Sequence, residues 1–297
     1  GPMMNQMLIG IAIAAALALG LPMGRAQAQA SQEGGLAADA AVTPARISAL
    51  VETMQIDKML VVMRQEGLDY GKTLNADMMG GNAGAGWTTR LEAIYDTDAL
   101  RRRIEAAMQR LYSEDAGTLA DVEAFFGAAQ GQKILSLEVE ARRAMLDSAT
   151  KDAAELAAQR MVENKDPRLD LLRRFAEVND LLEMNVAGAM TSNLAFYQGL
   201  AAEGAFGKEL TEKQMLSDVW NQEPQVRADS EKWLNTFLAL AYRPLSDADL
   251  GAYIAFSETP AGQRLNTVLF SAFDEAFRQV SFDLGRAAAR QMQGNDI

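Results

Sequence analysis

The sequence predicts an all-α protein made of two tandem, similar helical bundles without a β-sheet. Apolar residues recur at helical spacing over most of the chain, and no stretch shows the sustained period-two alternation typical of a half-buried strand. Proline, which interrupts helices, occurs at only 7 of 297 positions. A short apolar motif also occurs twice at one fixed separation, which indicates an internal repeat.

The composition excludes several classes of chemistry. The chain has no cysteine and no histidine, which excludes disulfides, thiol catalysis, Ser-His-Asp catalysis and zinc or haem binding through the usual ligands. It carries a net charge of -12 and no basic stripe, so we expect no nucleic-acid binding. We therefore expect a protein that is not an enzyme and that holds no metal ion or other cofactor.

The first 30 residues resemble a targeting segment. Gly1-Pro2 is typical of a scar left by tag removal, and the apolar run from Met7 to Leu21 is shorter than the roughly 20 residues of a membrane span. Small residues at 26, 28 and 30 suit cleavage, so we expect a signal peptide at 1–30 and a mobile leader at 31–43. Met3 to Gln6 lack the usual Lys or Arg, and an uncleaved anchor is the alternative. Cleavage predicts a periplasmic protein without an integral membrane span.

The mature chain is predicted to form a series of helices. Thr43-Pro44, Ser246 and Thr259-Pro260 are helix starts, since each combines an N-cap hydroxyl with a proline or an acidic first turn. Glycines 67 and 71 are expected to end the first helix. The expected helices are 44–66, 88–112, 119–129, 131–162, 168–199, 211–220, 224–242, a short one after Ser246, and 260–292.

Residues 163–168 are predicted to link the two halves. The residue before a proline avoids helical backbone angles, so a break is expected at Asp166-Pro167. We expect one helical repeat at 44–162 and a second at 169–293, either packed together or apart.

The two repeats share a motif of a short helix followed by a glycine. The matching positions are Leu119, Val122, Phe125 and Gly131 in the first copy and Leu250, Tyr253, Phe256 and Gly262 in the second, each pair 131 residues apart. The apolar residues at i, i+3 and i+6 form one helix face, and the glycine permits a sharp turn or a close helix contact. The basic residue that follows, Lys133 or Arg264, is expected to pair with an acidic side chain.

The second copy of the motif carries a family resemblance. From Tyr253 to Leu265 it reads YIAFSETPAGQRL, which resembles the signature of domain-of-unknown-function family 2059. A methionine-rich helix from Met54 to Met63 adds to the likeness, whereas the first copy has Gly127 to Gln130 in place of the proline turn. The resemblance implies an exported helical domain of unassigned role and supplies no catalytic residues.

The last helix contains the main candidates for a binding surface. Its apolar residues cover a wide arc, so it is either buried at the centre of a bundle or partly exposed as a groove for a partner or a lipid. The candidate binding residues are Phe270, Phe273, Phe277, Trp233, Tyr253 and Phe256.

Four other patterns favour ordinary structure over chemistry. Ser148 to Lys151 has the spacing of penicillin-recognising enzymes but lies within a charged helix. The glycine-rich segment 80–86 lacks a phosphate-binding signature. The 16 methionines suit core filling better than copper(I) binding. Acidic pairs such as Asp247 and Asp249 lack the loop that binds calcium.

These observations predict an exported, non-enzymatic interaction protein with an envelope protein as its partner: an adaptor, a chaperone-like binder or an envelope-assembly factor. The alternative is a carrier of a small apolar ligand or lipid between helices. A glycan-cleaving enzyme that uses carboxylates alone is a third hypothesis, for which the sequence singles out no carboxylate pair.

Overall fold

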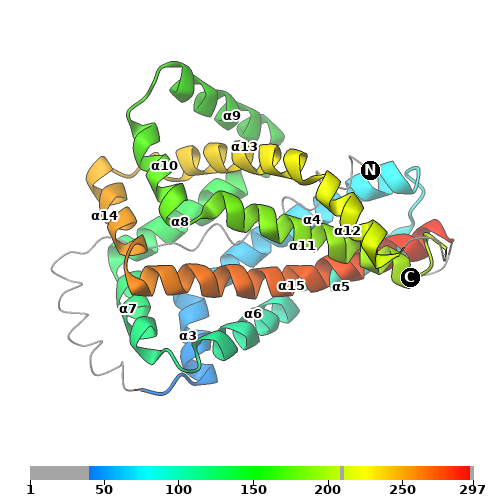
Figure 1. Cartoon of the computed structure of the whole chain (residues 1–297), viewed down its shortest axis with the longest axis horizontal. Helices are drawn as coiled ribbons and strands as arrows, with labels where there is room; N and C mark the ends of the chain where they lie inside the picture. Colours follow the sequence, from blue (N-terminus) through cyan, green and yellow to red (C-terminus); the bar gives the residue numbers. More distant parts are fainter. Residues whose placement is uncertain (1–39, 208–210, 295–297) are drawn as a thin grey trace.

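The computed structural model describes residues 40–207 and 211–294, which form helices joined by short turns and contain no β-strand (Figure 1). The predicted all-α fold is confirmed. The predicted signal peptide and residues 31–39 of the predicted leader lie outside the described residues. Within the described ranges, none of the helices combines the length and the apolar composition that a membrane crossing requires.

The helices form two comparable series, one in each half of the chain. The first half contains α3 (Pro44–Thr53), α4 (Ile56–Met78), α5 (Ala85–Ile94), α6 (Thr97–Tyr112), α7 (Ala116–Gly127), α8 (Ala129–Ala144) and α9 (Ser148–Glu163). The second half contains α10 (Arg168–Val178), α11 (Leu181–Ala202), α12 (Glu212–Asn221), α13 (Glu223–Ala241), α14 (Asp247–Ser257) and α15 (Pro260–Met292). The break between α9 and α10 falls at the predicted linker.

The three predicted helix starts are confirmed by their hydrogen bonds. Thr43 and Ser246 each accept a hydrogen bond on the side-chain oxygen from the backbone N–H three residues on, at 3.1 and 3.0 Å. Thr259 does the same at 3.1 Å, and proline occupies the next position after Thr43 and Thr259. These residues satisfy backbone donors that have no partner within the helix.

Four predicted helices are each two helices in the structure. Gln55 and Asp180 have left-handed backbone angles, with φ of 57° and 50°, and turn the chain before α4 and α11. Asp96 and Asp147 cap α6 and α9, since their carboxylates accept hydrogen bonds from backbone N–H groups three residues on, at 3.1 Å in each case. The predicted spans 44–66, 88–112, 131–162 and 168–199 were therefore wrong in their continuity.

Gly67 and Gly71 do not end a helix, contrary to the prediction, because α4 continues to Met78. A Cβ at Gly67 would lie 2.3 Å from the ring of Tyr95, and one at Gly71 would lie 2.1 Å from a methyl group of Leu91. The two glycines make room for side chains of the neighbouring segment, and their role is packing.

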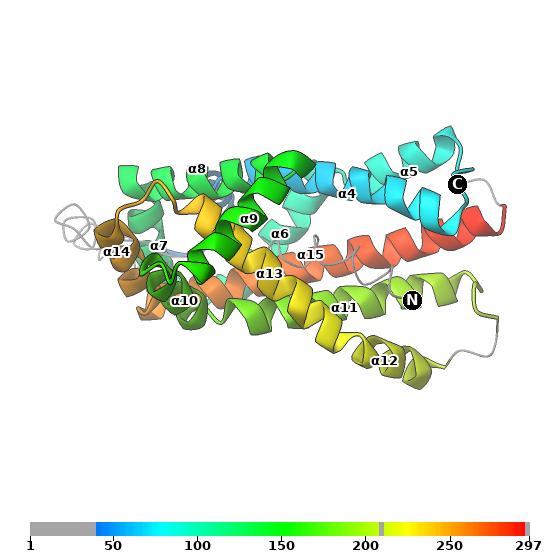
Figure 2. The same ribbon diagram turned by 90° about the horizontal axis from the view of Figure 1, so that it is seen from above.

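The longest helix, α15, runs through the middle of the molecule and joins its halves (Figure 1). Its 33 residues give it a length of about 50 Å. It packs along α11 of its own half and against α5, α6 and α7 of the first half. Seen from above in Figure 2, it lies between α11 and the first-half helices α4 and α5.

Two glycines bring α11 and α15 into backbone contact. A Cβ at Gly199 would lie 2.1 Å from the carbonyl oxygen of Phe282, and one at Gly285 would lie 2.2 Å from the carbonyl oxygen of Phe196. Both distances are shorter than non-bonded carbon and oxygen atoms tolerate, so only glycine fits at either position. This contact sets the separation of the two central helices.

The two halves are packed together on one main core. The largest cluster of buried apolar side chains includes residues from α3 to α8 and from α10 to α15. A smaller cluster of Val186, Ala189 and Val226 lies within the second half. The predicted linker therefore separates two series of helices that share a core.

Ion pairs on the surface also connect the halves. Arg264 pairs with Asp115 at 3.1 Å, and Arg110 pairs with Glu275 at 2.6 Å. The prediction that the basic residue after the motif glycine pairs with an acid is confirmed for Arg264. Each such exposed pair adds at most about 1 kcal/mol, so burial of apolar surface holds the halves together.

Equivalent glutamines in the two halves make matching contacts. The Gln132 amide donates hydrogen bonds to the last carbonyl of α3 at 2.7 Å and to a carbonyl near the end of α7 at 2.6 Å. The Gln263 amide, 131 residues later, donates to the last carbonyls of α10 at 3.0 Å and α14 at 2.6 Å. The duplication stays a prediction from the sequence, and these contacts support it.

Replacing Gly199 or Gly285 with alanine is expected to lower the free energy of unfolding by about 2–3 kcal/mol, because α11 and α15 must separate. Urea unfolding followed by circular dichroism measures this change. Gly251, within α14, has open space at its Cβ position and provides the control. There, alanine is expected to stabilise the protein by about 0.5–1 kcal/mol. Equal effects at all three positions would contradict the backbone contact.

Asp274 is the titratable group at the same helix crossing. It lies on α15 against Gly188 of α11, where a Cβ would come within 2.6 Å of its Oδ1 atom. Burial raises the pKa of Asp274 to about 7. Because the pKa is higher in the folded chain, this group stabilises the fold below its ordinary pKa of 3.8, and that contribution is lost as the pH rises through 7.

Asp274→Asn is therefore expected to stabilise the protein increasingly as the pH rises, by about 1–2 kcal/mol near pH 8 after allowance for partial exposure. Urea unfolding from pH 5 to pH 8 measures the difference from the unmodified chain. Glu92→Gln, at an exposed position on α5, is the control and should give a constant difference. A constant difference for Asp274→Asn as well would refute the assignment.

Candidate functional site

The structure places the predicted binding residues of the second half mainly in the core. Phe270, Phe273, Phe277, Tyr253 and Phe256 are each at most 5% exposed, and Trp233 is half-buried. Of the two alternatives for the last helix, central burial is the one observed, because α15 is covered by α11 and by α5, α6 and α7. These residues hold the fold together, and a candidate site has to be built from others.

The apolar residues of the repeat motif are core residues as well. Phe125 and Phe256, which the 131-residue offset relates, stack on each other with ring centroids 3.4 Å apart. Leu119 and Leu250 are fully buried. The motif therefore supplies the contact at which α7 and α14, the two copies of the short helix, meet.

The motif glycines permit close contact, as predicted for one of them. A Cβ at Gly262 would lie 2.3 Å from the carbonyl oxygen of Phe256, so glycine lets α15 begin directly against α14. Gly131 is buried at the equivalent position of α8.

Tyr253 belongs to a buried polar cluster between the halves. Its hydroxyl and that of Tyr242 donate hydrogen bonds to Glu138 Oε2 at 3.0 and 2.7 Å. Burial raises the pKa of Glu138 well above its ordinary value, and the two hydrogen bonds partly oppose this shift. Since Glu138 is only 1% exposed, the cluster ties α8 to α13 and α14 and faces no solvent.

Trp233 lies beside this cluster. Arg142, one turn after Glu138 on α8, lies over the Trp233 ring with its Cζ 5.2 Å from the ring centroid. Arg142 also pairs with Glu66 at 2.8 Å, and the Trp233 ring stacks on Phe237. The partly exposed Trp233 is therefore held in place by contacts within the fold.

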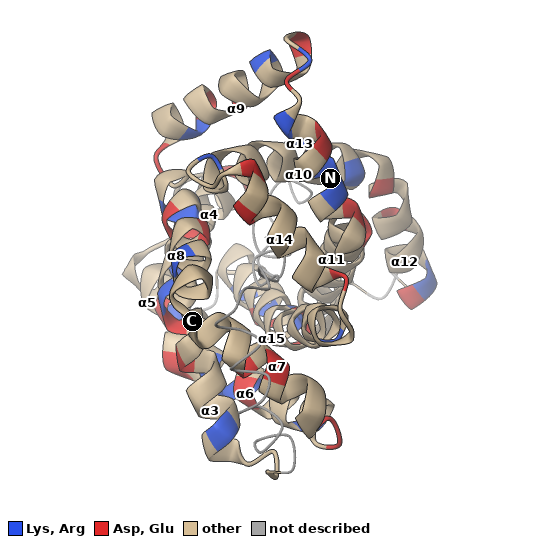
Figure 3. Cartoon of the chain, turned by 90° about the vertical axis from the view of Figure 1, so that its left-hand side faces the viewer, with Lys and Arg blue, Asp and Glu red and all other residues tan. Residues whose placement is uncertain are grey.

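Helix α9 forms an arm at the edge of the molecule and lies across α13 (Figure 3). Only Ala158 of its residues is buried, and Leu156 and Val162 are 47% and 56% exposed. An ion pair between Glu155 and Lys232 of α13, at 3.4 Å, adds to the contact. The arm leaves space beneath it because so little of its surface is packed.

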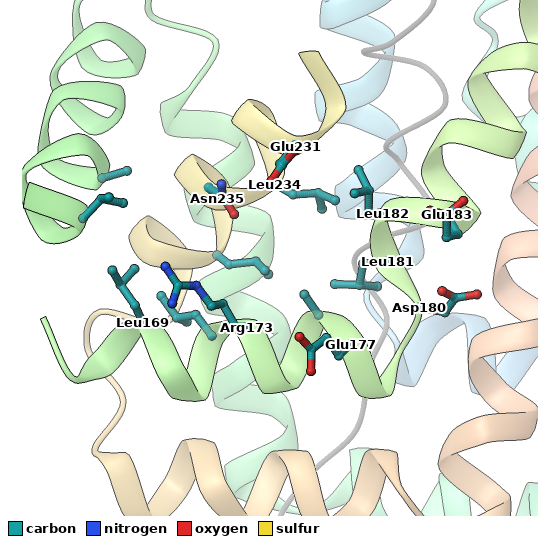
Figure 4. Close-up of a pocket in the computed structure, with 15 residues that line it drawn as sticks. Leu169, Arg173, Glu177, Asp180, Leu181, Leu182, Glu183, Glu231, Leu234 and Asn235 are labelled. Atoms are coloured by element: carbon teal, nitrogen blue, oxygen red, sulfur yellow. The ribbon is translucent and has the colours of Figure 1, made fainter. Parts of the chain in front are cut away.

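A largely apolar pocket of about 330 Å³ lies beneath this arm, between α9, α10, α11 and α13. Its leucines come from three helices: Leu169 and Leu172 from α10, Leu181 and Leu182 from α11, and Leu234 and Leu238 from α13. Figure 4 shows Leu181, Leu182 and Leu234 projecting into the same space. Ala158 and Val162 of α9 line the pocket from the side of the arm.

Charged side chains surround the mouth of the pocket. Glu177, Asp180, Glu183 and Glu231 bring carboxylates to it, and Arg173 brings a guanidinium group (Figure 4). All five residues are exposed. The mouth therefore carries more negative than positive charge around an apolar floor.

Two further hollows lie nearby. One of about 330 Å³ occupies the other side of α9, against α13, and shares Ala158, Val162 and Glu231 with the first. The other is a groove of about 370 Å³ between α11, α12 and α13, beside Trp220, which is 67% exposed. Arg227 in this groove pairs with Glu183 at 2.5 Å and with Glu223 at 2.7 Å, so its charges are largely compensated. The hydrogen bond from Arg227 lowers the pKa of Glu183.

The sequence reasoning missed the pocket because it treated 131–162 as one helix. A continuous helix would carry Leu156 and Val162 away from the bundle, whereas the turn at Asp147 folds α9 back over α13. The available signal was the Asp147-Ser148 cap followed by an alanine-rich helix with isolated large apolar residues. The Ser148 to Lys151 pattern lies in the first turn of α9, where Ser148 is exposed.

The site has no match to guide its interpretation. No family model matches the chain, and neither the curated proteins nor the solved structures contain a match. The resemblance to family 2059 stays a prediction. Across residues 40–207 and 211–294, no group of three or more acidic side chains is placed to hold a metal ion.

Glu138→Ala is expected to lower the free energy of unfolding by about 3 kcal/mol, because two buried tyrosine hydroxyls lose their acceptor. Glu138→Gln keeps an oxygen that can accept from both hydroxyls, and we expect it to cost less than half as much. Thermal and urea unfolding at neutral pH compare the two variants. Equal losses would show that the two hydrogen bonds contribute little to the joint between the halves.

Proposed function

We propose that this protein is an exported, non-enzymatic interaction protein that binds an apolar segment of an envelope protein in the pocket beneath α9. The observation that carries the proposal is the pocket itself, an open hollow of about 330 Å³ with leucines from three helices. Exposed apolar surface of this kind is typical of a place where a partner docks.

The exposed face of α9 supports the same proposal. Leu156 and Val162 leave large apolar surfaces in water, at a cost of about 25 cal/mol for each Å² that a partner would cover. A segment that enters beside α9 would cover Val162 and the pocket leucines together. The arm and the pocket would then act as one docking surface, as an adaptor or a chaperone-like protein requires.

The composition supports a binding role over a catalytic one. The chain contains neither histidine nor cysteine, and the carboxylates at the pocket lie on its exposed rim. Periplasmic localisation is proposed from the apolar N-terminal run and the small residues after it.

A carrier of a small apolar ligand is the second candidate. The volume of about 330 Å³ lies at the lower end of the range of roughly 300–1,000 Å³ in which small-molecule sites occur. A short acyl chain or an aromatic ring would fit a pocket of this size.

Filling the pocket tests the proposal. Ala176 of α10 lines the pocket and is partly exposed, so Ala176→Trp should occupy the space without disturbing the core. We expect capture of crosslinked envelope proteins by the tagged mature chain to fall by about tenfold, the effect of losing one well-packed apolar contact.

Ala93→Trp, at an exposed position on α5, is the matched control and should leave capture unchanged. Capture of the same proteins by both variants would contradict the proposal. Native mass spectrometry of the purified chain separates the two candidates: a bound small molecule that Ala176→Trp excludes would favour the carrier.

A further inference from the structure

We infer that the occupant of the pocket is a basic amphipathic segment, whose apolar side chains enter the pocket while its Lys or Arg side chains meet the rim. The inference rests on the proposed function and specifies the chemistry of the partner. The pocket floor selects for apolar side chains, and the charges at its mouth select among segments that are equally apolar.

The charges at the mouth are strongly unequal. Four carboxylates, those of Glu177, Asp180, Glu183 and Glu231, line the pocket with one basic side chain, Arg173. Arg173 does not compensate them, because its ion-pair partner is Asp170, at 4.0 Å and outside the lining. An incoming segment therefore meets negative charge as its apolar side chains enter.

Three of the four carboxylates are available to a partner. Glu183 is occupied, since Arg227 donates to both of its oxygens at 2.5 and 3.0 Å. Glu177, Asp180 and Glu231 make no ion pair with any basic side chain in the described part of the chain. They come from α10, the α10–α11 turn and α13, so they approach the mouth from different sides.

The neighbouring groove shows what a compensated surface looks like. Between α11, α12 and α13, the single Arg227 bridges Glu183 and Glu223, and the same groove exposes Leu216 and Trp220. It offers apolar surface without uncompensated carboxylates. A segment chosen for apolar content alone would find both surfaces, whereas a basic one is directed to the pocket beneath α9.

The net charge of -12 attracts any basic peptide, so the test must separate the rim from the whole molecule. Three synthetic helical peptides of about 18 residues share one apolar face. They differ only in polar residues, which are all Lys, all Glu or all Ser. Binding is measured by calorimetry on the mature chain at low and high ionic strength.

Two triple variants with the same net charge give the comparison. The rim variant carries Glu177→Gln, Asp180→Asn and Glu231→Gln. The control carries Glu92→Gln, Glu114→Gln and Asp77→Asn, at exposed positions outside the pocket lining. We expect the Lys peptide to bind unmodified protein most tightly, and the rim variant to weaken this binding by about tenfold at low salt. The control variant should weaken it by less than about threefold.

Two outcomes would overturn the inference and leave the proposed function intact. The first is equal affinity for the Lys and Ser peptides, and the second is equal weakening by the rim and control variants. Absence of binding by all three peptides, or binding that Ala176→Trp leaves unchanged, would instead contradict the proposed function.

Discussion

Gly199 on α11 and Gly285 on α15 face each other's helix backbone at a separation that leaves no room for a side chain. This contact fixes the two longest helices of the second half as one unit. The opposite side of α15 then receives α5, α6 and α7, so that the first half is built on a surface that the second half provides. Helix α13 packs on α11 and α8, and α9 rests on α13 in turn. The pocket thus lies at the end of a chain of contacts that begins at the two glycines.

The interior of this joint is not wholly apolar. Glu138, Tyr242 and Tyr253 share hydrogen bonds within the core, where two apolar contacts would fill the same space without desolvating a carboxyl group. Such a cluster restricts how the halves fit together, because its hydrogen bonds are satisfied only when α8 meets α13 and α14 in one arrangement. The stacked Phe125 and Phe256 rings act in the same direction, since they join the two copies of the motif helix.

Local signals predicted much of the secondary structure, and tertiary contacts decided the rest. Thr43, Ser246 and Thr259 were recognisable because an N-cap is a short-range hydrogen bond that the nearby sequence encodes. Gly67 and Gly71 were misinterpreted as helix ends because their role depends on Tyr95 and Leu91 in another helix. The phenylalanines of α15 gave the correct helix face but could not show which face was covered.

The candidate site was beyond the reach of sequence patterns for a related reason. Its lining comes from four helices, and whether they enclose a space depends on the angle at which the chain turns at Asp147. That turn leaves α9 in contact with α13 through little more than Ala158. It also brings Leu234 and Leu238 of the second half under an arm of the first.

The account centres on a partner segment that binds under this arm, and amide hydrogen exchange of the mature chain saturated with the Lys peptide tests it most directly. The account predicts slower exchange in α9, α10 and the first turns of α11, with α12 and the exposed end of α5 unchanged. Protection confined to α12 and the groove beside Trp220, or spread evenly over the acidic surface, would contradict it.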